Sequence, residues 1–319
     1  MNIQFEGQIN DRATQGILKQ IVNSASVSDS FPSVRVYFNL PHKTKLDKNF
    51  FNILLLWEPK SVYPWQYRAD VLEQFQHVIS FSPWRATKYN LKNWVFHPYD
   101  FSAINHVHHK SNRDIAISMI NAAKFSAGYT SNYGLRRKIL KDLEVAGFDV
   151  KLYGSDWEMT KLEELRKRFA ALRLSISAKE RISLSETISQ LFCKYSMYQG
   201  PVENKFEILS RSELALIVEN DSDWITEKIF DAFICGAIPV FVGPQFNEFL
   251  PFLEKCIIRI PEGRKNIVQS LKNISPTEIQ TKREAIRLVL SDATLFEEFD
   301  IDLVWKKVGR MICQEVYHS

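Results

Sequence analysis

The sequence lacks closely spaced cysteines, long apolar runs and a leader-like start, and each absence excludes a class of protein. Its four cysteines form no CxxC pair, so we expect free thiols in a reducing compartment rather than a disulfide framework. No apolar run approaches the roughly 18 residues that a membrane-spanning helix requires. The first eight residues lack the basic-then-apolar order of a signal peptide. These absences predict a cytoplasmic protein without a transmembrane segment.

The sequence also lacks a strong charge of one sign and the short motifs of several common enzyme families. Its 41 basic and 37 acidic residues leave a net charge of +4, which argues against a polybasic arm for nucleic acid. Walker A, GxGxxG, GxSxG and HExxH patterns are absent. Basic residues between 161 and 173 alternate with glutamate, which is typical of a solvated helix face. We therefore expect no nucleic-acid partner.

Glycine is scarce in the first third of the chain, where proline is concentrated instead. After Gly16 no glycine occurs until Gly128, whereas six of the twelve prolines fall between Pro32 and Pro98. Such a shift near residue 120 indicates two domains with different loop chemistry. We expect an N-terminal domain over 1–120, a second domain over 121–295, and a C-terminal amphipathic helix over 296–319 that docks across one or both.

Apolar runs of strand length alternate with helical periodicities, which predicts an α/β fold built on parallel sheets. Strands are expected at 34–40, 52–57, 77–82, 114–120, 148–153, 213–218, 237–242 and 256–260. Helical segments are expected at 65–76, 135–146, 158–194, 226–234, 245–253 and 301–316.

The segment 218–244 carries the densest set of candidate chemical groups. An apolar strand ends in a polar loop, and the loop runs directly into a helix that begins near Thr226. The carboxyl edge of an open α/β sheet is where ligands bind, and a helix start attracts anions. Lys228 opposes the helix dipole in the first turn. It is either a solvated surface charge or part of an anion site, for example for a diphosphate.

Residues 219–244, ENDSDWITEKIFDAFICGAIPVFVGP, resemble glycosyltransferase family 10, the α-1,3/1,4-fucosyltransferases. The shared features are Glu-Asn after an apolar strand, an aromatic residue, Thr-Glu-Lys and a helix that leads to Gly-x-x-Pro-Val. Residues 135–140 with 150–154 resemble the family's arginine-bearing helix and following strand, and 54–59 its strand that ends in glutamate. The loop before Trp224 is shorter than is usual in the family, and Ser212-Glu213 replaces a Tyr-Lys/Arg pair. Both differences lie close to the expected donor pocket.

The resemblance implies a GT-B-like fold, in which two Rossmann-like domains with parallel sheets face a cleft. The first domain, 1–120, would then bind the acceptor, and the second, 121–295, the nucleotide-sugar donor. It also implies an inverting reaction in which an acceptor hydroxyl attacks the anomeric carbon as the nucleoside diphosphate leaves. GDP-fucose is the implied donor substrate, a glycan is the implied acceptor, and no cofactor is needed. Two alternatives stay open, another nucleotide sugar on the same scaffold and a non-catalytic glycan-binding module. Peripheral contact with a membrane also stays open.

Glu58 is the candidate general base. It follows an expected apolar strand, and apolar surroundings raise the pKa of a carboxyl group, which makes it a stronger base. The alternative is a solvated glutamate at the start of a loop, because Pro59 follows it.

Arg136 and Lys228 are the candidate clamp for the donor diphosphate. A guanidinium offers paired contacts and an ammonium offers a compact charge, and both stabilise a departing anion. Arg137 is expected to be a surface charge.

Four more residues are donor-binding candidates because of the resemblance. Glu227 resembles the family's ribose-binding carboxylate, the alternative being a glutamate that only stabilises a helix start. Asn220 and Trp224 would line the donor, with Trp224 either offering a stacking face or belonging to the core. Lys205 keeps the family's spacing to Glu-Asn and is either a ligand or a surface lysine.

Two patterns could hold a metal ion, and neither is expected to. Asp221 and Asp223 form a DxD sequence after a strand, which in other glycosyltransferases binds a divalent cation. The Thr-Glu-Lys continuation better fits a metal-free site. The stretch 106–109, His-Val-His-His, lacks cysteine or carboxylate partners at ligand spacing and is expected to be a solvated linker.

Aromatic residues are abundant, with 40 among 319, which excludes a disordered chain. Four of the seven tryptophans lie within 57–94, in the expected acceptor domain. Trp65 and Trp84 each follow a proline at an expected strand-to-helix turn. We expect these two rings to contact the acceptor sugar, the alternative being that they pack in the core.

Overall fold

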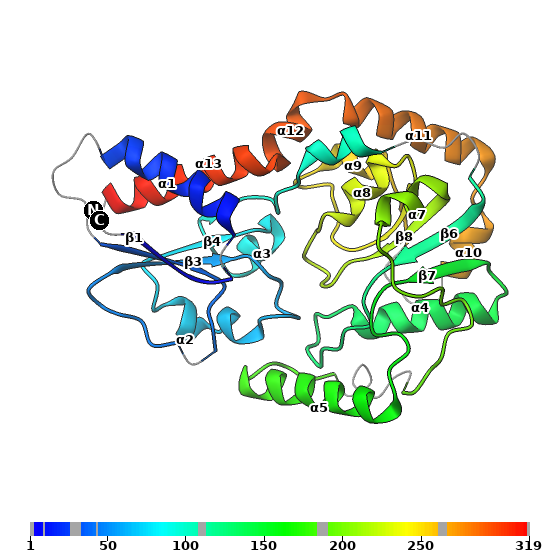
Figure 1. Cartoon of the computed structure of the whole chain (residues 1–319), viewed down its shortest axis with the longest axis horizontal. Coiled ribbons are helices and arrows are strands. Elements are labelled where there is room, and N and C mark those ends of the chain that lie inside the picture. Colours follow the sequence, from blue (N-terminus) through cyan, green and yellow to red (C-terminus); the bar gives the residue numbers. More distant parts are fainter. Residues whose placement is uncertain are drawn as a thin grey trace. The chain divides into compact units, whose positions relative to one another are not determined.

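The computed structural model describes residues 3–8, 10–25, 33–42, 44–107, 113–183, 191–260 and 267–317. The chain folds into two compact units (Figure 1). Unit 1 comprises residues 1–101 and 293–319, and unit 2 comprises residues 102–292. Unit 1 is therefore discontinuous in sequence and takes in the segment that contains the expected C-terminal helix.

Unit 1 is built on a five-stranded parallel sheet in the order β1-β2-β3-β4-β5 within its described residues. The strands are β1 (Ile3–Gly7), β2 (Val34–Phe38), β3 (Phe51–Leu56), β4 (His77–Ser80) and β5 (Asn93–Trp94). The helical segments are α1 (Asp11–Ala25), η1 (Pro64–Tyr67), α2 (Ala69–Leu72), α3 (Pro83–Lys88), α12 (Ala293–Phe299) and α13 (Ile301–Tyr317). The apolar runs that predicted β2, β3 and β4 are buried, as a parallel sheet covered on its faces requires.

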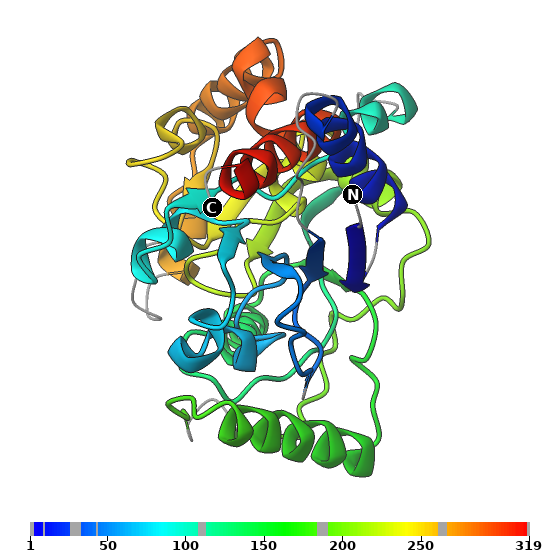
Figure 2. The same ribbon diagram turned by 90° about the vertical axis from the view of Figure 1, so that its left-hand side faces the viewer.

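Helices α1 and α13 pack side by side in unit 1, as Figures 1 and 2 both show in blue and red. Glycines allow the close approach. A Cβ on Gly16 of α1 would lie 2.8 Å from Cβ of Trp305, and one on Gly309 of α13 would lie 2.8 Å from Cβ of Gln20. Helix α13 covers the amphipathic segment 301–316, and within unit 1 it packs on α1.

Unit 2 is built on a second parallel sheet of five described strands, in the order β10-β9-β8-β6-β7. Its strands are β6 (Ile115–Ile120), β7 (Val150–Tyr153), β8 (Ser212–Val218), β9 (Ile238–Val242) and β10 (Ile258–Arg259). Its helical segments, with η2 beginning at the unit boundary, are η2 (Phe101–His106), α4 (Tyr133–Val145), α5 (Lys161–Ser177), α7 (Lys205–Arg211), α8 (Lys228–Ile234), α9 (Pro251–Glu254), α10 (Ile267–Lys272) and α11 (Pro276–Leu290). Two units with parallel sheets confirm the predicted α/β class.

Two predicted helices are wrong in extent. The segment 65–76 forms the short η1 and α2, because Arg68 between them is extended (φ −75°, ψ 139°) and the side chains of Gln66 and Tyr67 bond to neighbouring loops. The segment 245–253 is helical only from Pro251, a residue that favours the first turn of a helix. The excursion 158–194 contains α5, which begins with a capping box of Thr160 and Glu163.

Candidate functional site

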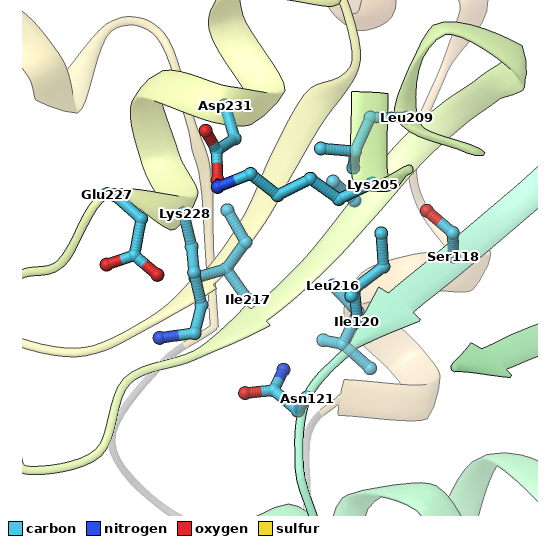
Figure 3. Close-up of a pocket in the computed structure, with 11 residues that line it drawn as sticks. Ser118, Ile120, Asn121, Lys205, Leu209, Leu216, Ile217, Glu227, Lys228 and Asp231 are labelled. Atoms are coloured by element: carbon cyan, nitrogen blue, oxygen red, sulfur yellow. The ribbon is translucent and has the colours of Figure 1, made fainter. Parts of the chain in front are cut away.

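A pocket of about 100 Å³ lies in unit 2 between the C-terminal halves of β6 and β8 and the helices α7 and α8 (Figure 3). It is lined by Ser118, Ile120, Asn121, Lys205, Leu209, Ala215, Leu216, Ile217, Glu227, Lys228 and Asp231. The structure therefore brings together three of the predicted donor-binding residues, namely Lys205, Glu227 and Lys228. The three side chains converge at the carboxyl edge of a parallel sheet, and this edge is where α/β folds bind their ligands.

Lys205 and Asp231 form an ion pair at one side of this pocket. Lys205 Nζ lies 2.6 Å from Asp231 Oδ2, and the Asp231 side chain is 4% exposed. Figure 3 shows this pair reaching from α7 to α8, with the ends of Lys228 and Asn121 on the other side of the pocket. Lys205 is thus neither an isolated surface lysine nor a cation without a countercharge.

Lys228 is held at the start of α8 by two residues of the preceding segment. Its Nζ donates a hydrogen bond to Thr226 Oγ1 at 2.8 Å and lies 3.6 Å from Glu219 Oε2. Its side chain is 19% exposed. The ammonium is therefore fixed in position while part of it stays accessible to a ligand.

Glu219 was not among the predicted site residues, yet it organises this part of the site. Its carboxylate is fully buried and accepts hydrogen bonds from the Thr226 backbone N–H at 2.9 Å and from Thr226 Oγ1 at 2.8 Å. Burial raises the pKa of Glu219, while Lys228 and the two bonds from Thr226 act in the opposite direction. The signal in the sequence was a glutamate that directly follows the apolar run 214–218.

Arg136 is buried behind the site rather than offered to solvent. It is 2% exposed, and its guanidinium donates to the carbonyl oxygens of Ala122 at 3.2 Å and Val218 at 2.8 Å and to Asn220 Oδ1 at 3.2 Å. Burial lowers its pKa to about 10, although Tyr133 and Glu219 favour the charged form. Arg136 joins the ends of β6 and β8, and direct contact with a diphosphate stays a prediction.

Asn220 and Trp224 lie in the loop between β8 and α8 with different exposures. Asn220 accepts a hydrogen bond from Arg136, and its carbonyl accepts one from the Asn132 N–H at 2.9 Å. Trp224 is 1% exposed, so the stacking face expected of it is packed into the core. A tryptophan in a short loop bounded by two buried segments is drawn inward by the hydrophobic effect.

Asn121 is a second residue that sequence reasoning missed. It follows β6 and is 6% exposed. Its Nδ2 is buried without a hydrogen-bond partner among the described residues. A buried amide donor without a partner is uncommon in native proteins, which marks Asn121 as a candidate ligand-binding residue at the wall of the pocket. Its position after an apolar strand, equivalent to that of Glu219, was the available signal.

Glu58 lies in unit 1, two residues beyond the end of β3. Hydrogen bonds from neighbouring residues hold its backbone in place. Its N–H donates to Asn39 Oδ1 at 2.9 Å, and its carbonyl accepts from Tyr67 OH at 2.6 Å and Gln66 Nε2 at 3.3 Å. Gln66 is fully buried and also accepts the Leu40 N–H through Oε1 at 3.0 Å. The half-buried Glu58 is therefore held at the carboxyl edge of the unit 1 sheet, as predicted for a strand-end residue.

Trp65 and Trp84 are both half-buried in unit 1. Trp65 donates its Nε1–H to the Leu40 carbonyl at 2.6 Å and contacts the rings of His42 and Tyr63, with centroids 5.4 and 4.9 Å away. Trp84 contacts Phe96 at 6.3 Å. Each ring thus has both a packed part and an accessible part, and their contact with an acceptor stays a prediction.

Within the described ranges, no group of three or more histidine, cysteine or carboxylate side chains is placed to bind a metal ion. Asp221 is fully buried and Asp223 is half-buried, so the two carboxylates of the DxD sequence differ in exposure. His108 and His109 lie outside the described residues. None of the helices that the structure describes is both long enough and apolar enough to cross a membrane.

Comparisons with known proteins agree with this fold. No protein-family model matches the chain. A putative fucosyltransferase-like protein of Arabidopsis thaliana is 29% identical over 105 residues, which are 30% of this chain and 20% of that protein. A glycosyltransferase from Rickettsia africae ESF-5 covers 99% of this chain and 84% of its own, with a TM-score of 0.50 and 10% identity. Anabaena Alr3699/HepE in complex with UDP and glucose covers 98% of this chain and 100% of its own, with a TM-score of 0.53 and 11% identity.

The fold of the chain is therefore the GT-B fold of glycosyltransferases, which confirms the predicted fold class. The similarity to the solved structures is one of fold alone. The match to the Arabidopsis protein spans a fifth of that protein's length.

Proposed function

We propose that the protein is a glycosyltransferase that transfers a sugar from a nucleoside diphosphate to a hydroxyl group of a glycan. The observation that carries this proposal is the convergence of Glu227, Lys228 and Asn121 on one pocket at the carboxyl edge of the unit 2 sheet. The GT-B fold and the partial similarity to a fucosyltransferase-like protein support the same reaction class. GDP-fucose is the first candidate donor, and another nucleotide sugar is the alternative.

Each charged group has a separate task in the proposed inverting reaction. Lys228 stabilises the negative charge that develops on the leaving diphosphate, because its ammonium is already held in place by Thr226 and Glu219. Arg136 holds the Asn220 side chain in position through a hydrogen bond. Glu227 binds the ribose hydroxyls. Glu58 of unit 1 is the proposed base that removes the proton of the acceptor hydroxyl as the new bond forms.

A thermal-shift panel with GDP, UDP, CDP and dTDP tests this proposal. A nucleotide that binds only the folded protein raises the melting temperature by mass action. We expect the largest rise with GDP, and we expect Lys228→Ala to abolish it. Lys255→Ala is the control, since Lys255 is exposed and outside the pocket. A response to UDP alone would overturn the choice of donor, and no response to any of the four would overturn the proposed class.

The proposal also requires transfer without a metal ion. We expect turnover to be unchanged in EDTA, because the charge on the diphosphate is met by side chains. Activity that EDTA removes and Mn²⁺ or Mg²⁺ restores would contradict this, and would direct attention to Asp221 and Asp223.

A further inference from the structure

A second and larger cavity, of about 430 Å³, lies wholly within unit 2. It shares no lining residue with the pocket of about 100 Å³ between β6, β8, α7 and α8, which we call the donor pocket. Its walls come from the loop after β6, the loop after β7, helices α4 and α5, and the segment 192–198. The lining residues are Ala123, Phe125, Arg137, Asp156, Trp157, Glu158, Met159, Thr160, Lys161, Glu164, Phe192, Cys193, Lys194, Tyr195 and Tyr198. Its volume falls in the range of small-molecule sites.

Five aromatic rings and six charged side chains line this cavity. Trp157 and Tyr195 are each 8% exposed and meet edge to face, with centroids 5.4 Å apart. Phe192 is 38% exposed at the rim. Flat apolar rings beside hydrogen-bonding groups suit a ligand with one apolar face and a polar edge, which describes a pyranose ring.

Arg137 supplies a buried positive charge to this cavity, so the prediction of a surface charge was wrong. It is 5% exposed. Its Nη1 donates to the carbonyl oxygens of Lys124 at 2.8 Å and Tyr133 at 3.2 Å, and its guanidinium lies 4.0 Å from the ring centroid of Phe125. Nη2 is buried without a hydrogen-bond partner among the described residues. Burying a guanidinium N–H without an acceptor is costly, so a negatively charged group placed at this wall of the cavity would be stabilised by Arg137.

Two of the carboxylates that line the cavity are paired with cations outside its lining. Glu164 lies 2.6 Å from Arg168 Nη2, and Asp156 lies 2.8 Å from Lys167 Nζ. Two further cations, Lys161 and Lys194, are exposed lining residues. The lining therefore carries three cations and three carboxylates, and because Asp156 and Glu164 are shared with Lys167 and Arg168, an added negative charge would still be attracted to the cations.

We propose that this cavity binds a sugar that carries a carboxylate, with the sugar ring against the aromatic walls and the carboxylate facing Arg137. The consecutive residues Arg136 and Arg137 then serve two separate sites. Arg136 supports the donor pocket, and Arg137 belongs to the acidic-sugar site. This inference does not depend on the identity of the donor or on the transfer reaction. The same chemistry is available from a free uronic acid or from a uronic acid at the end of a glycan.

Ligand-observed NMR titrations without any nucleotide test this site. The probes are methyl glucuronoside and its neutral counterpart methyl glucoside. We expect the wild-type protein to bind the glucuronoside about tenfold more tightly, since a hydrogen bond to a charged group is worth about that factor. Two results would overturn the proposal. One is equal affinity for the two probes, and the other is no detectable binding of the glucuronoside at concentrations up to about 50 mM.

Two variants locate the binding. Arg137→Met keeps the aliphatic stem and should reduce the preference for the acid to within about twofold. Phe192→Ala trims an exposed ring at the rim, so it should fold normally and weaken both probes by about fivefold. Phe169→Ala is the matched control, because Phe169 is an exposed phenylalanine of α5 that does not line the cavity, and it should change neither affinity. If Arg137→Met fails to fold, an unchanged affinity in Phe192→Ala still overturns the proposal.

A glucuronate-terminated oligosaccharide separates the two sources of ligand. Binding at least about tenfold tighter than that of the monosaccharide indicates a glycan site with further contacts, and equal binding indicates a site for the free acid. Because no nucleotide is present, a negative result leaves the nucleotide panel and its interpretation unaffected.

Discussion

Lys205 and Asp231 face each other across the edge of the donor pocket, with 2.6 Å between Nζ and Oδ2, and the aspartate is almost completely buried while the lysine is 39% exposed. The pair joins α7 to α8. Its role in the fold is therefore distinct from any contact that Lys205 makes with a nucleotide.

Replacing Lys205 with methionine is expected to lower the free energy of unfolding by about 1–3 kcal/mol, because Asp231 then stays buried without its countercharge. Urea denaturation measures this loss. The double variant Lys205→Met with Asp231→Asn should recover part of it. Lys255→Met, at an exposed position, serves as the control and should change stability by less than about 0.5 kcal/mol. An unchanged unfolding midpoint in Lys205→Met would show that the pair contributes nothing.

Glu58→Gln is expected to lower kcat by at least about 100-fold, since an amide cannot accept the proton of the acceptor hydroxyl. The backbone N–H and carbonyl of Glu58 make the hydrogen bonds with Asn39, Gln66 and Tyr67, and both groups are unchanged in the variant. Turnover is measured together with the thermal shift from the donor nucleotide, which should be retained. A glycan-binding module without catalysis would be indifferent to the change.

Glu144 links α4 to the segment 192–198, which lines the proposed acidic-sugar site. It lies 2.9 Å from Lys141 Nζ and accepts hydrogen bonds from the Ser196 hydroxyl at 2.7 Å and the Ser196 N–H at 2.8 Å. The bonds from Lys141 and Ser196 lower the pKa of Glu144 to about 2. Because the folded pKa lies below the unfolded value, this stabilisation is present above about pH 4.5 and is lost as pH falls toward 2.

Glu144→Gln should therefore be less stable than the wild-type protein at pH 7, by about 1 kcal/mol after allowance for solvent screening. The difference should shrink as the pH is lowered through 4.5 toward 2. Urea midpoints at several pH values measure it, with Glu207→Gln as the control at an exposed position. A difference that stays constant with pH would mean that the charge of Glu144 is not what stabilises the segment.

Gly16→Ala is expected to destabilise unit 1 by about 1–3 kcal/mol, because the new Cβ would lie 2.8 Å from Cβ of Trp305. Trp305 also stacks on Trp57, with centroids 5.1 Å apart, so the near-ultraviolet circular dichroism should change as well. Gln15→Ala, at an exposed neighbouring position in the same helix, provides the comparison. A more stable Gly16→Ala protein would show that α1 and α13 have room to separate.

The strands and the carboxyl-edge loop were predictable because both depend on local sequence. An apolar run such as 213–218 is buried whatever its partners, and the polar residues that follow must lie at the end of the strand. The discontinuous unit 1 was not predictable, since the pairing of α1 with α13 joins residues almost 300 positions apart. Helix α1 itself was missed, although Asn10, which accepts the Ala13 N–H at 3.0 Å, and Asp11 in the first turn are typical helix-start residues.

The side-chain roles were less predictable than the elements that carry them. Arg136 and Arg137 are neighbours of the same type, and only the packing of α4 against two different loops separates their environments. Trp224 and Glu219 are both buried, one as core and the other as a hydrogen-bonded carboxylate. Burial at these positions follows from tertiary contacts, which a local pattern does not contain.

The discontinuity of unit 1 has a consequence for biosynthesis. Residues 102–292 form one uninterrupted stretch, so unit 2 can fold as soon as that stretch has left the ribosome. The sheet of unit 1 is synthesised earlier, yet α13 emerges only after all of unit 2. Until then α1 lacks its packing against α13, including the approach of Gly16 to Trp305. Unit 1 is therefore begun before unit 2 and completed after it. Chaperone dependence during translation should accordingly be concentrated in the N-terminal segment.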